Sequence, residues 1–237
     1  MKVSVITPTR DRSEAFTLLE RWMGHQTRQP DQWVVVNDGV VPYEYEYDDY
    51  FPGVQEVINR VPKPEEGHSL CGNVKEGLAA VKGDLILFME DDDWYHPDYI
   101  QYMARAFLKS PVVGASPAAY YNVAYRRARQ LRNTGHASLA GTGVADSLAW
   151  LVKQVADRGR PFIDMGLWRY AREHQGLIFR NIHQDGRKLH VGIKGMPGIK
   201  GIGNGHQPYG NSDPKMEVLK NWIGEDYLAY KEYVRAS

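Results

Sequence analysis

The chain of 237 residues is poor in cysteine, has no long apolar run and carries no net charge. Its single cysteine, Cys71, excludes an internal disulfide framework and a zinc site built from several cysteines. No stretch of about eighteen apolar residues is present, and the first residues lack the charged and apolar regions of a secretory signal. We therefore expect a water-soluble, cytoplasmic protein.

The two halves of the chain carry opposite net charges. Residues 1–110 contain 11 basic and 19 acidic side chains, whereas residues 111–237 contain 18 basic and 10 acidic ones. This asymmetry indicates a first half that binds a metal ion and a second half that contacts an anion. With 43% hydrophobic residues, a chain of this length can bury one large core.

The first half alternates short apolar runs with amphipathic segments. The pattern predicts strands over 2–7, 33–36, 54–58 and 85–89, and helices over 13–23, 69–81 and 97–109. Helical crossovers between strands predict an α/β fold with a mainly parallel sheet, whose ligands bind at the carboxyl ends of the strands. The polar segments 7–11, 37–39 and 90–93 should therefore meet in one crevice.

The second half is less regular. We expect two strands within 112–132, a glycine-rich loop over 135–143, helices over 144–156 and 162–174, a hairpin of 177–183 with 188–193, and a C-terminal helix over 213–235. The hairpin prediction depends on Asp185-Gly186, a strong turn signal.

Four consecutive carboxylates, Glu90 to Asp93, follow the most apolar of the strands. Adjacent anions repel one another, so the fold must supply compensating positive charge. Oxygen ligands of this kind suit Mg²⁺ or Mn²⁺, which typically bind one or two carboxylates together with substrate phosphates. A solvated acidic loop is the alternative, but the position directly after a buried strand favours a metal site.

Three stretches of the first half resemble the motifs of GT-A-type glycosyltransferases of the large family-2 set. They are residues 4–12 (SVITPTRDR), 35–39 (VVNDG) and 83–94 (GDLILFMEDDDW), the last followed by Pro97-Asp98. Order and spacing together are more specific than any single motif. The resemblance implies a single GT-A domain over 1–237, with a nucleotide-sugar-binding half over 1–110 and an acceptor half over 111–237.

The same resemblance implies an activity and a set of site residues. The activity is a metal-dependent, inverting transfer of a sugar from a nucleotide-diphosphate donor, most simply a UDP-sugar, to an acceptor hydroxyl. Glu90 stands where the family has the first Asp of its Asp-x-Asp motif. The nucleotide-sugar would be bound by Thr7, Pro8, Arg10, Asp38, Glu90 and Asp91, and the Mn²⁺ or Mg²⁺ ion by Asp92.

An inverting transfer needs a base that takes the proton of the acceptor hydroxyl. In the family this base is an acid well after the metal motif, and residues 164–169 (DMGLWR) are similar to that segment. Asp164 is therefore the first candidate base, although it would also suit a helix cap. Asp146, which follows a glycine-rich loop, is the second candidate.

Seven glycines lie within residues 191–210, interleaved with Lys194, Lys200 and His206. Such a backbone can approach a ligand closely, and the side chains add positive charge and a metal ligand. By resemblance to GT-A enzymes with a mobile C-terminal loop, residues 191–210 would form a lid over the diphosphate. His206 would be a metal ligand, with His190 and His183 as substitutes. A plain flexible linker is the alternative.

The acceptor is left open by the sequence. The basic run over 126–132 can be a solvated face or can contact an anionic acceptor, and Tyr120, Tyr121 and Tyr125 suit stacking on a sugar or a base. A small molecule, a glycan, a lipid-linked acceptor and a nucleic acid all remain, with a DNA base hydroxyl as a minority interpretation.

Two other functions use a similar pattern. A nucleotidyltransferase shares the α/β sheet and the acidic metal site, but the loop over 7–12 lacks the glycines typical of that class. A non-catalytic module that binds sugar or nucleic acid on the same scaffold would be consistent with Glu90 in place of Asp.

Overall fold

The computed structural model describes residues 1–43, 54–132, 135–198 and 209–233. The strands are β1 (Val3–Thr9), β2 (Gln32–Asn37), β3 (Gln55–Asn59), β4 (Leu85–Phe88), β5 (Trp94–Tyr95), β6 (Val112–Ser116), β7 (Ala119–Asn122), β8 (Arg127–Gln130), β9 (Thr142–Ala145), β10 (Leu177–Arg180), β11 (His190–Lys194) and β12 (Asn211–Ser212). The α-helices are α1 (Ser13–Gly24), α2 (Ser69–Ala80), α3 (Tyr99–Phe107), α4 (Ala149–Ala156), α5 (Ile163–Glu173) and α6 (Glu217–Ile223). Short 3-10 helices are η1 (Pro64–Glu66), η2 (Leu139–Gly141), η3 (Asp146–Leu148) and η5 (Gly224–Tyr230).

Within the described residues, the larger sheet has the strand order β10-β6-β9-β4-β1-β2-β3. Strands β4, β1, β2 and β3 are parallel, β9 runs antiparallel between β4 and β6, and β10 is parallel to β6. The predicted α/β fold with a mainly parallel central sheet is therefore confirmed. Strands from both halves of the chain belong to this one sheet, because β6, β9 and β10 extend the row that β1 to β4 begin.

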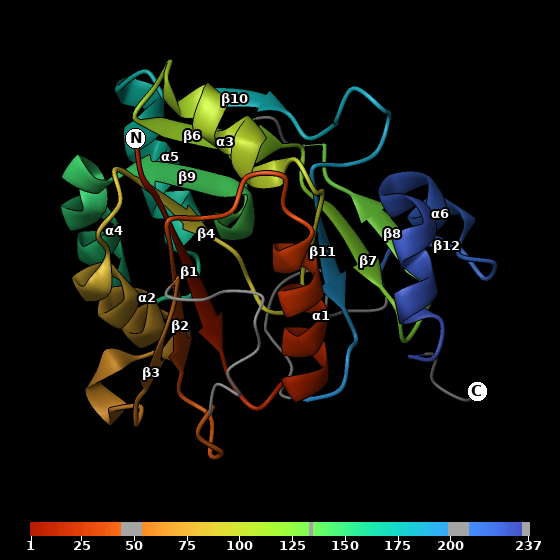
Figure 1. Ribbon diagram of the computed structural model, residues 1–237, viewed down its shortest axis with the longest axis horizontal. Coiled ribbons are helices and arrows are strands. Elements are labelled where there is room, and N and C mark those ends of the chain that lie inside the picture. Colours follow the sequence, from red (N-terminus) through yellow and green to blue (C-terminus); the bar gives the residue numbers. More distant parts are fainter. Residues whose placement is uncertain (44–53, 133–134, 199–208, 234–237) are drawn as a thin grey trace.

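Helices cover both faces of the larger sheet because its strands are apolar on both sides (Figure 1). Val3 and Val5 point from β1 toward α1 and α3, whereas Ile6 points toward α2 on the opposite face. Helices α4 and α5 lie on the same face as α2, and α4 packs against both α2 and α5. Among the helices of the described ranges, none combines the length and the apolar character that crossing a membrane requires.

A smaller sheet lies beside the first, with the strand order β12-β8-β7-β11-β5 in the described part of the chain (Figure 1). Its core includes Trp94, Tyr121 and Ile193, which pack against α6 and η5. Trp22 of α1 joins this core and donates a hydrogen bond of 3.1 Å to the hydroxyl of Tyr230. Helix α1 thereby contacts both sheets and fixes the position of one relative to the other.

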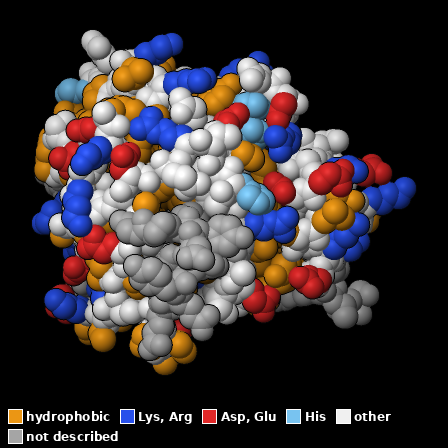
Figure 2. Space-filling view, in the orientation of Figure 1, with side chains coloured by type: hydrophobic (Ala, Val, Ile, Leu, Met, Phe, Trp, Pro, Cys, Tyr) orange, Lys and Arg blue, Asp and Glu red, His pale blue; other side chains and the backbone are white. Residues whose placement is uncertain are grey.

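The opposite charges of the two halves of the chain do not produce two oppositely charged faces. Figure 2 shows Lys and Arg side chains interspersed with Asp and Glu side chains over the visible surface. This follows from the topology, because segments of the second half run between and beside segments of the first.

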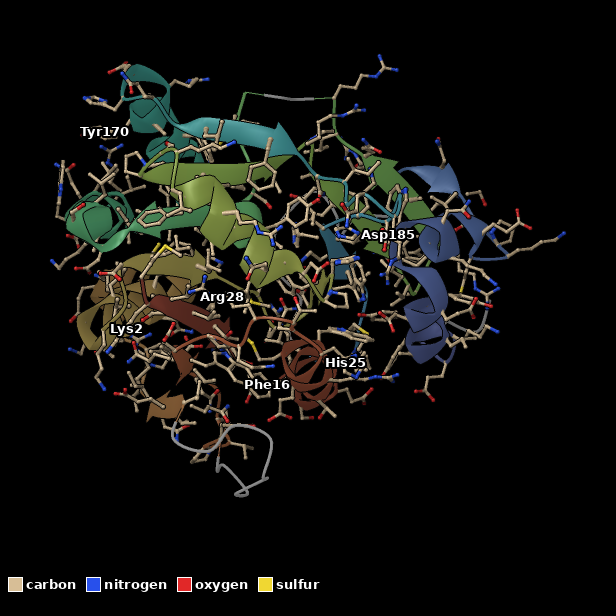
Figure 3. All side chains as sticks on the ribbon, turned by 45° about the horizontal axis from the view of Figure 1, so that its top comes forward. Lys2, Phe16, His25, Arg28, Tyr170 and Asp185 are labelled. Carbon is tan, nitrogen blue, oxygen red and sulfur yellow. The ribbon has the colours of Figure 1, made fainter. Side chains whose placement is uncertain are left out.

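The predicted hairpin of 177–183 with 188–193 is wrong. Strand β10 pairs with β6 in the larger sheet, whereas β11 pairs with β7 and β5 in the smaller one. The turn signal itself is real, since Gly186 has a φ of 89°, but the chain uses it while crossing from one sheet to the other. In Figure 3, Tyr170 of α5 lies at the left edge of the molecule, whereas Asp185, between β10 and β11, lies well to its right.

Three other predictions for the second half need correction. Residues 112–132 contain three strands rather than two. Strand β9 spans the end of the expected loop over 135–143 and the start of the expected helix over 144–156, so that α4 begins only at Ala149. The C-terminal helix is interrupted at Gly224, which has a φ of 67° that side-chain-bearing residues rarely adopt.

Candidate functional site

A pocket of about 280 Å³ opens at the carboxyl ends of β1, β2 and β4. The three polar strand ends expected to converge do so, because the parallel register of these strands brings their ends to the same edge. The second half of the chain supplies the facing wall through η2, β7, β11 and the start of α5.

The acidic cluster, Glu90 to Asp93, forms the floor of this pocket, and its three aspartates are almost fully buried. Arg12 compensates part of the charge from the loop after β1. Its Nη1 lies 2.8 Å from Asp91 Oδ1 and 3.2 Å from Asp92 Oδ2. Thr9, the last residue of β1, donates a hydrogen bond of 2.7 Å to Asp91 Oδ2.

A second cation reaches the cluster from the other half of the chain. The Nζ atom of Lys194, at the end of β11, lies 2.7 Å from Asp92 Oδ1, 2.8 Å from Asp93 Oδ1 and 3.6 Å from Glu90 Oε2. His190, also on β11, places Nε2 at 2.7 Å from Asp93 Oδ2. The positive charge that the four adjacent carboxylates require therefore comes from two segments far apart in sequence.

Burial and these partners separate the carboxylates in acidity. Desolvation raises the pKa of Glu90 to about 8, with Lys194 opposing the change and the neighbouring aspartates adding to it. Desolvation also raises the pKa of Asp91 to about 6, although Arg12 opposes it. For Asp93 burial acts in the same direction, but Lys194 and His190 outweigh it and hold the pKa below its ordinary value.

The acidic cluster has the composition and spacing that a hard divalent cation requires. One oxygen each from Glu90, Asp92 and Asp93 lies within 4.8 Å of the other two. Three carboxylate oxygens that converge in this way fit Mg²⁺ or Mn²⁺, which take oxygen ligands. The residues present therefore fit the metal ion that the sequence implied.

Asp38 lines the pocket just after the end of β2, and its two carboxylate oxygens have different surroundings. Its Oδ1 accepts a hydrogen bond of 3.0 Å from Asn73 Nδ2. Its Oδ2 is buried and accepts no hydrogen bond within the described residues, although Arg60 Nη1 lies 3.8 Å away. A buried carboxylate oxygen without a donor indicates a ligand that brings one.

The three residues predicted from the end of β1 do not have equal access to the pocket. Pro8 and Arg10 line it, and Arg10 Nε is buried without a hydrogen-bond partner in the described part of the structure. Thr7 instead lies fully buried in the sheet, where its Oγ1 accepts a hydrogen bond of 2.9 Å from Trp33 Nε1. Thr7 therefore supports the strand end rather than the pocket surface.

Asp164 lies in the pocket wall contributed by the second half of the chain. It is the second residue of α5, with Phe162 in the cap position, so it is not the N-cap. Burial raises its pKa, although a backbone hydrogen bond from Met165 opposes the change. His136 Nε2 approaches its Oδ2 to 4.0 Å. A partly desolvated carboxylate of this kind is a stronger proton acceptor than one in water.

Asp146, the second candidate base, is not brought to the pocket. It is exposed at the start of η3, and its N–H donates a hydrogen bond to the carbonyl oxygen of Asp84. Asp84 directly precedes β4, so Asp146 lies at the amino end of that strand, whereas the acidic cluster follows its carboxyl end.

The remaining lid predictions have different outcomes. Lys200 and His206 lie outside the described residues, as does half of the expected lid over 191–210. Lys194 and His190 are part of β11 and contact the acidic cluster, so the first residues of the expected lid are a buried strand.

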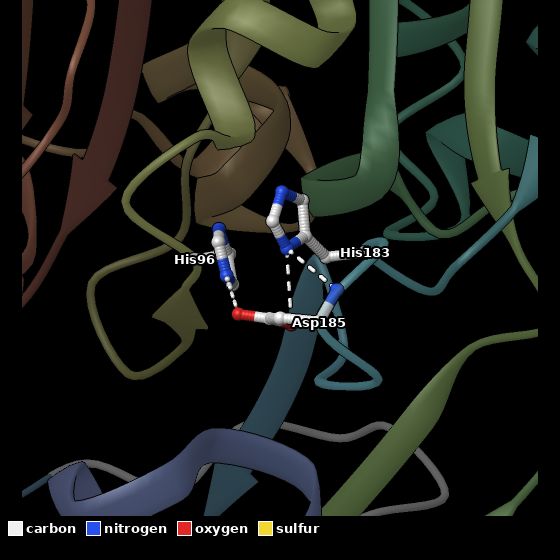
Figure 4. Close-up of side chains that lie close together, drawn as sticks. All are labelled: His96, His183 and Asp185. Carbon is white, nitrogen blue, oxygen red and sulfur yellow. Dashed lines mark hydrogen bonds and ion pairs between the residues drawn. The ribbon is translucent and has the colours of Figure 1, made fainter.

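His183, the other substitute ligand, belongs to a separate cluster with His96 and Asp185 (Figure 4). His96 Nδ1 accepts a hydrogen bond from the Asp98 N–H, so its Nε2 carries the proton and donates to Asp185 at 3.1 Å. The Asp185 N–H likewise points at His183 Nδ1. Because these ring nitrogens already bond protein groups, we interpret the cluster as a connection between two loops rather than as a metal site.

The basic run over 126–132 partly holds the C-terminal segment in place. Arg126 and Arg127 donate hydrogen bonds to the carbonyl oxygens of Pro214 and Gly210. These contacts reduce the number of side chains that remain for an anionic acceptor.

Several pocket residues received no role from the sequence. Arg12 belongs to a quoted motif but received no role. Asn73 and His68 carry no local signal, whereas Tyr120 was expected only to stack on a sugar or a base. Tyr120 owes its position to Gly192 on the neighbouring strand, where a Cβ atom would lie 2.5 Å from the tyrosine ring.

These features define a GT-A-type α/β protein with an acidic, cation-lined pocket at its sheet edge. Residues 4–196 match the model of glycosyl transferase family 2. The chain therefore belongs to that family, which confirms the resemblance found in its motifs.

Individual relatives agree with this assignment. The chain is 31% identical over 108 residues, 44% of its length and 38% of the relative's, to the uncharacterised glycosyltransferase YwdF of Bacillus subtilis (strain 168). Two S. aureus TarS structures, residues 1–349 in complex with UDP and with UDP-GlcNAc, each align over 81% of the chain at 14% identity. Their TM-scores are 0.60 and 0.53, and the aligned part covers 60% and 58% of those chains. The chain thus spans less than two thirds of each of these relatives.

Proposed function

We propose that this protein is a metal-dependent, inverting glycosyltransferase that moves a sugar from a UDP-linked donor to an acceptor hydroxyl. The observation that carries the proposal is the pairing, in one pocket, of a cation-compensated acidic cluster with a half-buried carboxylate, Asp164, on the facing wall. The family match favours sugar transfer over nucleotidyl transfer. We further propose that residues 1–237 act as one GT-A unit in the cytoplasm, with donor and acceptor halves meeting at this pocket.

The donor nucleotide would bind between the ends of β1 and β2. Asp38 Oδ2 is a buried acceptor that suits an N–H or hydroxyl of the nucleoside, and Arg10 supplies a donor at the neighbouring position. That TarS structures contain UDP and UDP-GlcNAc supports a uridine nucleotide for this chain too.

The diphosphate would lie over the acidic cluster. Asp92, with Glu90 and Asp93, would hold the divalent ion, which supplies positive charge to the diphosphate when bound. The guanidinium of Arg12 adds fixed positive charge beside the same carboxylates. Charge placed where the leaving group becomes negative lowers the barrier without reorganisation.

Asp164 would orient the acceptor hydroxyl and take its proton as the new glycosidic bond forms. Its raised pKa, which burial causes, makes the carboxylate a stronger proton acceptor. Phe162, which lines the pocket and is 57% exposed, and the half-buried Tyr120 offer aromatic surfaces on which a sugar ring can stack.

Release of the nucleoside diphosphate from a panel of UDP-, GDP- and TDP-sugars, with and without Mn²⁺, tests this proposal. We expect Mn²⁺-dependent release of UDP by the wild-type protein and its loss in Asp92→Asn. Replacing the base in Asp164→Asn should reduce turnover by about 10²–10⁴-fold. The matched control is Asp146→Asn, an exposed aspartate outside the pocket, which should retain full turnover. Failure of every donor to bind would instead favour a non-catalytic module.

A further inference from the structure

The Lys194 ammonium occupies the position among the carboxylates where a divalent ion would bind. The three carboxylates whose oxygens converge within 4.8 Å are Glu90, Asp92 and Asp93. The same three carboxylates surround Lys194 Nζ at 3.6, 2.7 and 2.8 Å. The three carboxylates that suit a divalent ion are therefore the same three that contact Lys194.

Each carboxylate oxygen of Asp91, Asp92 and Asp93 already contacts a partner among the described residues. Asp91 is held by Thr9 and Arg12, and Asp92 uses one oxygen for Arg12 and the other for Lys194. Asp93 uses one oxygen for Lys194 and the other for His190. A metal ion that uses Asp92 and Asp93 therefore competes for oxygens that cations of the protein already contact.

If the Lys194 ammonium moved away, the oxygens of Asp92 and Asp93 that now contact it would be free to bind another cation. The Lys194 backbone is fixed, since it pairs with Asn122 in the register of β11 with β7 and its carbonyl oxygen accepts a hydrogen bond of 2.8 Å from the Val123 N–H. Only the side chain can move, and its four-carbon stem carries a single compact charge that can change partners.

We propose that Lys194 is the resident counter-ion of the acidic cluster and competes directly with the divalent ion for Asp92 and Asp93. The proposal rests on the function proposed above, because it assigns a metal to that cluster. An ammonium and a divalent cation a few ångströms apart repel strongly in a buried site, so the two exclude each other. The free protein therefore binds the metal weakly, and the nucleotide diphosphate strengthens metal binding by giving the displaced ammonium a new anionic partner.

Mn²⁺ binding by the full chain, followed by electron paramagnetic resonance without nucleotide, tests the competition. Lys194→Met should bind Mn²⁺ about tenfold more tightly than wild type, or tighter still, because the competing charge is gone. Lys194→Arg keeps the charge and should bind Mn²⁺ as weakly as wild type. Lys188→Met is the matched control, since the Lys188 ammonium contacts Gln130 rather than the acidic cluster. Equal or weaker Mn²⁺ binding by Lys194→Met would overturn the proposal.

Thermal unfolding covers the case in which Lys194→Met is unstable without metal, because it leaves buried carboxylates uncompensated. Mn²⁺ should then raise its melting temperature more than that of wild type, by mass action on the folded state. A variant that stays unfolded at millimolar Mn²⁺ also contradicts the proposal, since the ion then fails to replace the ammonium. UDP binding by the wild-type protein in the same series reports separately on the proposed function.

Discussion

The hydroxyl of Thr9 donates a hydrogen bond of 2.7 Å to the carboxylate of Asp91, joining the ends of β1 and β4 across 82 positions of sequence. Both side chains are buried, at 7% and 2% exposure. The contact helps to hold the Asp91 carboxylate in place, although its three acidic neighbours repel it. The site is therefore organised by the strand ends as well as by the acidic residues themselves.

Removing this hydroxyl should destabilise the protein. Thr9→Val keeps the shape of the side chain but leaves Asp91 Oδ2 without its donor, which should lower the free energy of unfolding by about 1–3 kcal/mol in urea denaturation. Thr17→Val is the control, because the Thr17 hydroxyl is exposed and bonds only the Ser13 carbonyl oxygen of its own helix. Equal stability of the two variants would show that the Thr9–Asp91 contact contributes nothing.

Asp164 should reduce stability at neutral pH while serving as the base. Because its pKa is raised in the folded state, the folded protein binds this proton more tightly than the unfolded chain. Its contribution to stability is present below the ordinary aspartate pKa and is lost as pH rises through the raised value. Asp164→Asn should therefore melt at a higher temperature than wild type at pH 8, and this difference should shrink toward pH 4.

The pH profile of turnover should follow the same carboxylate. Activity with saturating donor should fall as acid protonates Asp164, at a pH above the ordinary aspartate pKa, because burial raises that pKa. A profile that stays flat down to the ordinary value, or an Asp164→Asn variant less stable than wild type at pH 8, would contradict the role given to this side chain.

Asn73 should set the affinity for the nucleotide through Asp38. Its side chain donates to Asp38 Oδ1 and accepts a hydrogen bond of 2.8 Å from Arg60 Nη1, which fixes the direction of the carboxylate. In Asn73→Leu the carboxylate loses that orientation, and UDP affinity should fall about tenfold, or ~1.4 kcal/mol. Asn221→Leu, at an exposed position of α6, should leave the dissociation constant measured by calorimetry unchanged.

Gly192 should be required for the position of Tyr120. An added Cβ would meet the tyrosine ring at 2.5 Å, so Gly192→Ala must move the ring and should cost about 1–3 kcal/mol of stability. The double-mutant cycle with Tyr120→Ala separates this contact from other effects of the substitution. If Gly192→Ala costs as much in the Tyr120→Ala background as in wild type, the proposed contact is wrong.

The parallel half of the fold was predictable because each of its signals is local. Apolar runs such as Leu85 to Phe88 define buried strands, and polar residues mark where they end. The convergence of Asp38 with the acidic cluster then follows from parallel topology alone. The pairing of Lys194 and His190 with that cluster was only partly predictable, since their sequence neighbourhood suggested a lid.

The second half was harder to predict because its strands pair with distant partners. Strand β9 lies between β4 and β6, and a run such as Thr142–Ala145, rich in small residues, has no period that indicates a strand. Strands β10 and β11 have the composition and turn of a hairpin, and only tertiary pairing sends them to different sheets. Asn73 was missed for the same reason, because it acquires its role through Asp38, a residue distant in sequence.

Calorimetric titration of UDP into the wild-type protein, with and without Mn²⁺, tests the central claim most directly. The account predicts a single site per chain whose affinity for UDP increases when Mn²⁺ is present, and whose binding is lost in Asp92→Asn. Absence of UDP binding in the presence of Mn²⁺ would contradict it.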